Sequence, residues 1–211
     1  MSGAPLIVAI DGPAGSGKTT LARLLAADLG LAFLDTGLIY RAVASRLIES
    51  GDALDDVAAA TRAAHEVGAD ELEDPRLQSE AVSRGASQVA VIPEVRAAML
   101  SFQRDFGDAA SGAVLVGRDI GTVVRPDANR KIFVTASLEE RAARRCKELQ
   151  ASGVATIYER VLQDLRQRDA RDRSRAVAPL VPAHDAFVID TTTQDVDAAF
   201  AIARAYVTGA G

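Results

Sequence analysis

Short apolar runs recur along the chain, separated by longer stretches in which apolar residues return every three or four positions. The runs have the length of strands. Because they are apolar at every position, they are typical of strands buried on both faces of a parallel sheet. We expect strands at residues 6–10, 31–34, 113–116, 132–134 and 187–190.

The stretches between the runs predict helices. Leucines at helical spacing from residue 21 to 29 form one face that ends at Gly30, and Gly51 ends a second helix over residues 38–50. Pro93, at a first-turn position, begins a helix that continues through Phe106. Further helices are expected at 55–67 and 195–207, and residues 68–86 predict an irregular or weakly helical piece.

Two capping boxes begin successive helices in the second half of the chain. One pairs Ser137 with Glu140, the other pairs Thr156 with Glu159, and Gly153 separates the two helices. Strands that alternate with helices indicate one α/β domain over residues 1–211, a three-layer sandwich with a parallel five-stranded sheet. We expect the core at about 1–50, 87–140 and 176–211, with excursions at 51–86 and 141–175.

Composition excludes several classes of protein. The chain has 211 residues, of which 48% are apolar and 25% charged, as in an ordinary globular domain. One cysteine, Cys146, and two histidines exclude a disulfide framework and make a zinc site improbable. No apolar run could span a bilayer, so we expect a cytoplasmic protein that does not bind membranes.

Charge is concentrated in two segments. Residues 141–175 hold nine arginines, one lysine and five acids, for +5, whereas residues 52–80 hold nine acids and two arginines, for −7. With a net charge of −5, a uniformly basic surface for DNA is excluded. The arginine-rich segment is the candidate for binding phosphates, since the guanidinium fork suits bidentate phosphate contacts.

The strongest chemical signal is a glycine-rich turn after the first strand. Residues 12–19 match G-x-x-x-x-G-K-[ST], and a helix follows, so backbone N–H groups and the helix N-terminus would cradle phosphates. Lys18 would reach the β- and γ-phosphates, and the Thr19 hydroxyl would ligate Mg²⁺. We therefore expect nucleoside triphosphate binding by Gly12, Pro13, Ala14, Gly15, Ser16, Gly17, Lys18, Thr19 and Thr20.

In the arginine-rich segment, Arg168, Asp172 and Arg175 follow helical spacing and share a face, with Arg171 beside them. The pattern fits either a solvated helix held by ion pairs or a clamp that closes over phosphates. Asp172, an acceptor among donors, would orient the arginines or accept from the amino group of a base.

Two polar turns follow predicted strands, at residues 35–41 and 117–122. Each combines a glycine, an arginine and an acid, and the carboxyl ends of strands are where ligands bind in open α/β sheets. With the P-loop they outline one cleft.

The phosphoryl acceptor is not fixed by these residues. A guanine-reading Asn-Lys-x-Asp element is absent, since the other lysines are Lys131 and Lys147. A short P-loop chain with an arginine-rich helix suggests a kinase whose lid excludes water. Alternatives are a kinase of another small acceptor, such as shikimate or gluconate, and an ATP-binding module that uses the helix on RNA. An aromatic content of 4% disfavours the second.

The chain resembles the bacterial cytidylate kinases, within the nucleoside monophosphate kinases, over nearly its whole length. The resemblance rests on several ordered motifs: Ile10-Asp11-Gly12-Pro13 before the P-loop, Asp35-Thr36-Gly37 with Tyr40-Arg41, residues 86–90, Gln103-Arg104, residues 117–122, and residues 168–180.

This resemblance implies Mg²⁺-dependent transfer from ATP to CMP or dCMP by a monomer with a monophosphate-binding insertion and a helical lid. It makes Arg168 and Arg171 catalytic candidates beside Lys18. The residues it assigns to the acceptor nucleotide are Thr36, Tyr40, Arg41, Ser87, Arg104, Arg118, Asp119, Arg168, Asp172 and Arg175.

Three positions depart from the family pattern. Thr36 stands where the family often has serine, and Val116 where it commonly has an acid that could help hold Mg²⁺. Residues 68–86 are shorter than the usual insertion and lack the alternation of a small antiparallel sheet.

Overall fold

A parallel sheet forms the centre of the molecule. The computed structural model describes residues 5–109 and 112–209. Within these residues the five strands lie in the order β2-β3-β1-β4-β5, and every neighbouring pair is parallel. The strands are β1 (Leu6–Asp11), β2 (Ala32–Asp35), β3 (Gly112–Gly117), β4 (Arg130–Thr135) and β5 (Phe187–Asp190), so all five predicted strands are confirmed.

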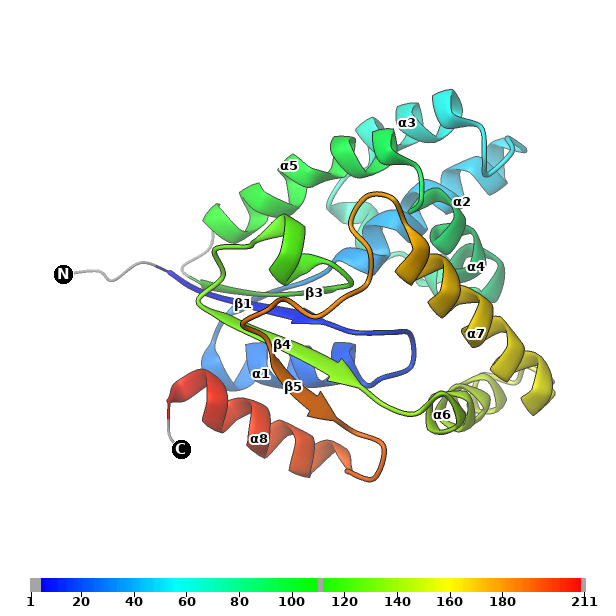
Figure 1. Ribbon diagram of the computed structural model, residues 1–211. Coiled ribbons are helices and arrows are strands. Elements are labelled where there is room, and N and C mark those ends of the chain that lie inside the picture. The colour runs from blue at the N-terminus through cyan, green and yellow to red at the C-terminus, as the bar shows by residue number, and fades with distance from the viewer. Residues whose placement is uncertain (1–4, 110–111, 210–211) are drawn as a thin grey trace.

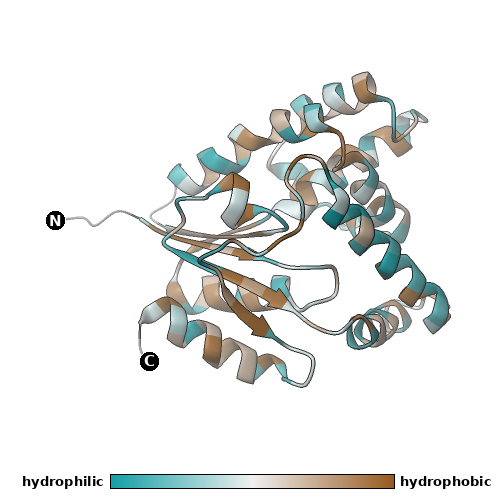
Figure 2. Cartoon of the chain, in the orientation of Figure 1, coloured by the Kyte–Doolittle hydropathy of each residue, from teal (hydrophilic) through white to brown (hydrophobic). Residues whose placement is uncertain are grey.

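Helices cover both faces of this sheet (Figure 1). Helices α1 (Lys18–Leu29) and α8 (Val196–Thr208) pack on one face, and α2 (Thr36–Ser50), α3 (Val57–Glu66) and α5 (Pro93–Ala109) lie over the other. Alternate residues of β1 belong to different clusters: Ile7 and Ala9 pack toward α2 and α5, Val8 and Ile10 toward α1 and α8. The three-layer sandwich is confirmed, and the strands stand out as apolar in Figure 2.

The first excursion is more regular than its sequence predicts. Two short 3₁₀ turns, η1 (Asp70–Glu73) and η2 (Pro75–Gln78), lead into helix α4 (Glu80–Val89). Ser79 caps α4 by accepting from the N–H of Val82 at 3.3 Å. The expectation of an irregular piece is confirmed for residues 68–79 and wrong for residues 80–86, which form a regular helix that packs closely on α2 at Gly85. A Cβ at this residue would lie 3.1 Å from the Cβ of Ala44 on α2.

The second excursion is a pair of packed helices, α6 (Leu138–Ala151) and α7 (Tyr158–Ser174). The first capping box is confirmed, since the Ser137 hydroxyl accepts from the N–H of Glu140 at 3.2 Å. The second is wrong: the N-cap position of α7 is Ile157, one position after Thr156, and no side chain caps this helix. In Figure 1, α7 runs alongside α4 at the end of the sheet where the strands finish.

Between β3 and β4 the chain makes a single π-helical turn, η3 (Ile120–Val124). This turn follows Arg118 and Asp119 directly and lies against the end of β1. Over the part of the chain that the structure describes, no helix combines the length and apolar character needed to cross a membrane.

Candidate active site

The P-loop connects β1 to α1 through a backbone that only glycine permits at its start. Gly12 has a φ of +155°, and a Cβ there would stand 2.0 Å from the carbonyl oxygen of Val134 on β4. Gly15 and Gly17 also have positive φ values, +74° and +84°. These conformations wrap the loop tightly enough for its N–H groups to converge on a phosphate.

Lys18 is the first residue of α1 and its ammonium group folds back over this loop. Its Nζ donates to the carbonyl oxygen of Pro13 at 3.0 Å, and the residue is only 7% exposed. Burial, reinforced by the positive charge of Arg118, holds the pKa of Lys18 well below its ordinary value, while Asp35 opposes that shift. Lys18 therefore stands among cations that only an incoming anion would balance.

A cavity of about 380 Å³ lies on the donor side of the P-loop, between α1, α6 and the chain after β5. The P-loop contributes Gly15, Ser16, Gly17 and Thr20. Thr191 organises the opposite wall, since its hydroxyl donates to the carbonyl oxygen of Ser16 at 3.1 Å and accepts from Arg144 at 3.0 Å. Thr191, Gln194 and Arg144 were not predicted from the sequence, because they belong to no motif.

A second cavity lies where β2 and β3 end and opens toward α7. Its polar lining consists of Thr36, Tyr40, Ser87, Arg96, Arg118, Asp119, Arg168, Asp172 and Arg175. Eight of these were candidates from the sequence, and the structure brings them together although they come from four segments of the chain.

Asp172 is the central acceptor of this cavity. Its side chain is 1% exposed and lies between Arg118, whose Nε donates to Oδ2 at 2.9 Å, and Arg175, which donates to Oδ1. Burial by itself would raise the pKa of Asp172, but the charges of Arg118 and Arg175 outweigh it and leave the pKa below its ordinary value. The arginine-rich helix is thus no solvated surface helix along this face.

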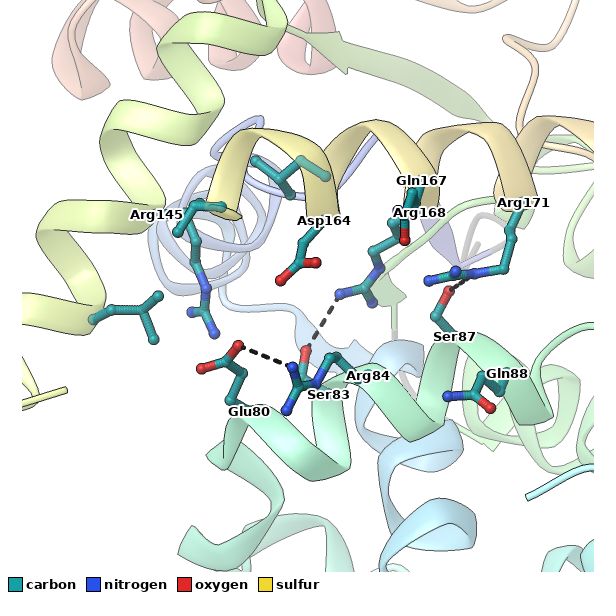
Figure 3. Close-up of a pocket in the computed structure, with 13 residues that line it drawn as sticks. Glu80, Ser83, Arg84, Ser87, Gln88, Arg145, Asp164, Gln167, Arg168 and Arg171 are labelled. Atoms are coloured by element: carbon teal, nitrogen blue, oxygen red, sulfur yellow. Dashed lines mark hydrogen bonds and ion pairs between the residues drawn. The ribbon is translucent and has the colours of Figure 1, made fainter. Parts of the chain in front are cut away.

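Two arginines of α7 reach across to α4. Arg168 donates to the hydroxyl of Ser83 at 3.3 Å, and Arg171 donates to the hydroxyl of Ser87 at 3.4 Å. Figure 3 shows both side chains extending from α7 toward α4 over a further cavity of about 250 Å³. Burial, with the positive charge of Arg118 beside it, lowers the pKa of Arg168 to about 9. These contacts close the lid helix against the insertion.

A fourth cavity, of about 340 Å³, joins the donor side to the acceptor side. Lys18, Thr19 and Asp35 line it together with Arg41, Arg118 and Arg168. Arg41 is held in place by the insertion, because its Nη1 donates to the carbonyl oxygen of Leu77 at 3.0 Å and to Oε1 of Gln78 at 2.9 Å. This is where a phosphoryl group would pass between two ligands.

Oxygen ligands suitable for a divalent cation meet in the same cavity. The Thr19 hydroxyl donates to Oδ2 of Asp35 at 3.2 Å. Asp35 also pairs with Val116 across β2 and β3, so β2 supplies a carboxylate beside Val116. A hydroxyl and a carboxylate together fit Mg²⁺, which prefers oxygen ligands.

One predicted site residue lies apart from the others. Arg104 is exposed on α5, and its guanidinium donates to the carbonyl oxygens of Val123 and Val124 at 3.1 and 3.0 Å. The acceptor cavity contains Arg96 from the same helix instead. Arg96 pairs with Asp119, and its guanidinium lies 5.5 Å from the ring centroid of Tyr40.

Comparison with known proteins identifies the family to which the chain belongs. The chain matches the family model described as cytidylate kinase over residues 8–207. It is 58% identical over 200 residues to a cytidylate kinase from Paramagnetospirillum magneticum, which covers 93% of this chain and 95% of that protein. A cytidylate kinase from Methylocella silvestris is 54% identical over 205 residues, covering 97% and 95%.

A solved structure of an uncharacterized protein from Eubacterium ventriosum resembles the fold with a TM-score of 0.54. Its sequence is 17% identical, over 96% of this chain and 98% of that one, and it supports the fold alone.

A P-loop at the end of a central strand, facing converging arginines from a helical lid, defines this enzyme as a P-loop kinase. Within that class, the chain belongs to the cytidylate kinase family.

Proposed function

We propose that the enzyme transfers the γ-phosphate of ATP to CMP or dCMP, giving ADP and CDP or dCDP, as a step of pyrimidine nucleotide metabolism. One observation carries the proposal. Asp172, a buried carboxylate, is fixed between Arg118 and Arg175 in a cavity next to the P-loop. An acceptor with donors at both sides complements a pyrimidine edge that has an amino group beside a ring nitrogen and a carbonyl.

On the donor side, the triphosphate would lie along the P-loop N–H groups, with Lys18 against its terminal phosphates. On the acceptor side, the monophosphate would be held by Arg41, Arg118 and Arg168. The acceptor's phosphate oxygen attacks the γ-phosphorus, the bond to the β-phosphate oxygen breaks, and ADP leaves. Lys18 and Arg168 stabilise the charge that moves during this transfer, with Arg171 closing the lid.

We propose that Mg²⁺ accompanies the triphosphate, held by the Thr19 hydroxyl and supported by Asp35. The cation would supply neutralisation of the triphosphate charge and orientation of the transferred group. We further propose that the enzyme works as a monomer in the cytoplasm, with the two nucleotides as its ligands and no nucleic acid or membrane partner.

The test is ADP release from Mg·ATP with CMP, dCMP, UMP, AMP and shikimate supplied separately. We expect turnover with CMP and dCMP far above that with the other acceptors and above an acceptor-free control. Turnover confined to shikimate or another small acceptor would show that the enzyme is a kinase of that acceptor instead. Turnover with none of the acceptors would leave only the proposed binding of ATP supported.

A further inference from the structure

A buried carboxylate at the end of β1 holds a segment that is distant in sequence. Oδ1 of Asp11 accepts from the N–H of Ile120 at 2.7 Å, and Oδ2 accepts from the N–H of Gly121 at 2.8 Å. These are the first two N–H groups of the η3 turn. The first N–H groups of a helical turn have no partner within it, so Asp11 caps η3 from more than one hundred residues away.

The capped turn carries two residues of the acceptor cavity immediately before it. Arg118 bonds to Asp172 on α7, and Asp119 pairs with Arg96 on α5. A shift of Ile120 and Gly121 would therefore move the side chains that hold the acceptor nucleotide. The P-loop begins at Gly12, on the other side of Asp11 along the chain, so this single carboxylate lies between the donor and acceptor halves of the site.

Gly121 lies next to both Asp11 and Lys131. A Cβ at this residue would lie 3.5 Å from Oδ2 of Asp11 and 3.2 Å from Cδ of Lys131 on β4. The charged groups that face Asp11 are Arg118 and Asp119 from the segment after β3, and Lys131 from β4. Lys131 is itself paired with Asp185 at 2.9 Å.

We propose that Asp11 is a positioning residue for the acceptor nucleotide: its ionised carboxylate, by capping η3, places Arg118 and Asp119 for CMP binding. The proposal rests on the proposed CMP kinase activity for its ligand. It extends that activity to a residue that touches neither nucleotide cavity, since its contacts are with the backbone of the turn.

Burial supports a pH-dependent readout. Desolvation raises the pKa of Asp11 to about 7, with the charge of Asp119 adding to the rise, while the two backbone N–H groups and Arg118 oppose it. Protonation takes away part of the acceptor capacity on which the two N–H groups depend. The cap therefore weakens as the pH falls through about 7.

The test compares the wild-type enzyme with Asp11→Asn, whose side chain offers one acceptor oxygen and places an amide donor against the second N–H. We expect the KM for CMP to rise about tenfold with the KM for ATP within about twofold, because only the acceptor half shifts. Asp127→Asn is the control: Asp127 follows the far end of η3, pairs with Arg125, and should leave both constants unchanged. An equal rise in both KM values would assign Asp11 to the P-loop and overturn the proposal.

The pH dependence gives a second readout that a purely structural defect would not produce. The phosphate of CMP titrates near pH 6 and affects both proteins alike, so the ratio of their KM values cancels it. We expect that ratio to be about tenfold at pH 8 and to approach one at pH 6, as wild-type Asp11 gains its proton. A ratio that stays constant with pH contradicts the proposal.

Two further measurements keep the test decisive. If Asp11→Asn does not fold, Asp11→Ser, whose smaller side chain keeps a single hydroxyl acceptor, should raise the KM for CMP selectively. Calorimetric titration of CMP in the absence of ATP compares the CMP affinity of the variant with that of the wild type without any catalysis. Loss of turnover in the wild type would then count against the proposed function, whereas an unchanged CMP affinity in the variant would count against Asp11.

Discussion

Six cations line the cavity of about 340 Å³ that joins the donor side to the acceptor side: Lys18, Arg23, Arg41, Arg118, Arg145 and Arg168. Burial, with the charge of Arg118 beside it, lowers the pKa values of Lys18 and Arg168, and the carboxylates of Asp35 and Asp172 oppose this only in part. The site therefore has a positive electrostatic potential before any ligand binds. Phosphoryl transfer requires such an arrangement, because it stabilises the charge of the transferred group.

Lys18→Ala should therefore abolish most turnover without unfolding the protein. We expect kcat to fall at least about 100-fold, because a charge aimed at the transferred phosphate is lost. Steady-state kinetics measure the effect, and circular dichroism verifies the fold. Lys147→Ala, which removes an exposed lysine from α6, is the control and should keep normal activity. A near-normal kcat in Lys18→Ala would contradict the catalytic role assigned to this lysine.

Asp172→Asn should damage the acceptor side selectively. The variant keeps the shape of the side chain but removes the charge that Arg118 and Arg175 share, so we expect kcat/KM for CMP to fall on the order of 100-fold. The Kd for ATP, measured by titration calorimetry, should change little. Glu159→Gln, an exposed change on the same helix, is the control. Equal losses of affinity for both nucleotides would show that Asp172 does not recognise the base of CMP.

At this scale the sequence identifies residues that lie within compact motifs and misses those that lie outside them. The P-loop residues and Asp172 with Arg175 are found because each group is contiguous or follows one helical face. Arg96 is missed for lack of a motif, although Gln103 lies two turns further along α5 and both are buried. Arg104 is one position beyond Gln103, and this step of roughly 100° turns it toward solvent.

The helices that close the site are joined through buried charge as well as apolar packing. Arg141 of α6 bonds to Asp169 of α7 at 2.7 Å, and its Nη1 also donates to the carbonyl oxygen of Ala14 in the P-loop at 3.1 Å. Both side chains are nearly inaccessible, at 4% and 8% exposure. Helix α7 is thereby linked to the P-loop through Arg141.

Asp169→Asn tests this connection. Removing one partner leaves the buried guanidinium of Arg141 uncompensated, so the free energy of unfolding should fall by about 3–5 kcal/mol. Urea denaturation measures it. The matched control is Asp28→Asn, which breaks the exposed pair between Asp28 and Arg204 and should cost less than about 1 kcal/mol. Similar losses in the two variants would contradict the importance of burial at Asp169.

Element positions are predicted well where periodicity and terminal residues agree, and poorly where tertiary packing decides. All five strands follow from their apolar runs. Helix α4 does not, because its glycine looks like an interruption in the sequence but serves close packing against α2. The helix also continues to Val89, across the boundary expected at residue 86.

At the scale of the whole molecule, the segments that line the proposed nucleotide sites converge on one end of the sheet, while the start of β1 and the end of α8 lie toward the other end (Figure 1). The order β2-β3-β1-β4-β5 explains this, because β1 lies between β3 and β4 and delivers the P-loop beside the turns after β2 and β3. The sequence predicted the cleft and the arginines of α7 that face it, but not Arg96, which enters the acceptor cavity from α5.

Stability should depend on pH through Asp11. Its pKa is about 7 in the folded chain, above the ordinary value of 3.8, so the folded state binds the extra proton between these two values. The free energy of unfolding of the wild type, relative to Asp11→Asn, should therefore fall on the order of 4 kcal/mol as the pH rises from 4 to 8. Urea titrations at several pH values check this, and a flat or rising difference would show that the carboxylate stays ionised.

Arg118 and Arg168 line both the acceptor cavity and the cavity that joins it to the P-loop. A small dianion such as sulfate that binds between these two arginines would occupy space that both nucleotides need. Sulfate should therefore inhibit competitively against ATP and against CMP, whereas chloride at equal ionic strength should not. The choice of buffer salt would then alter the apparent affinity of this enzyme for both of its substrates at once.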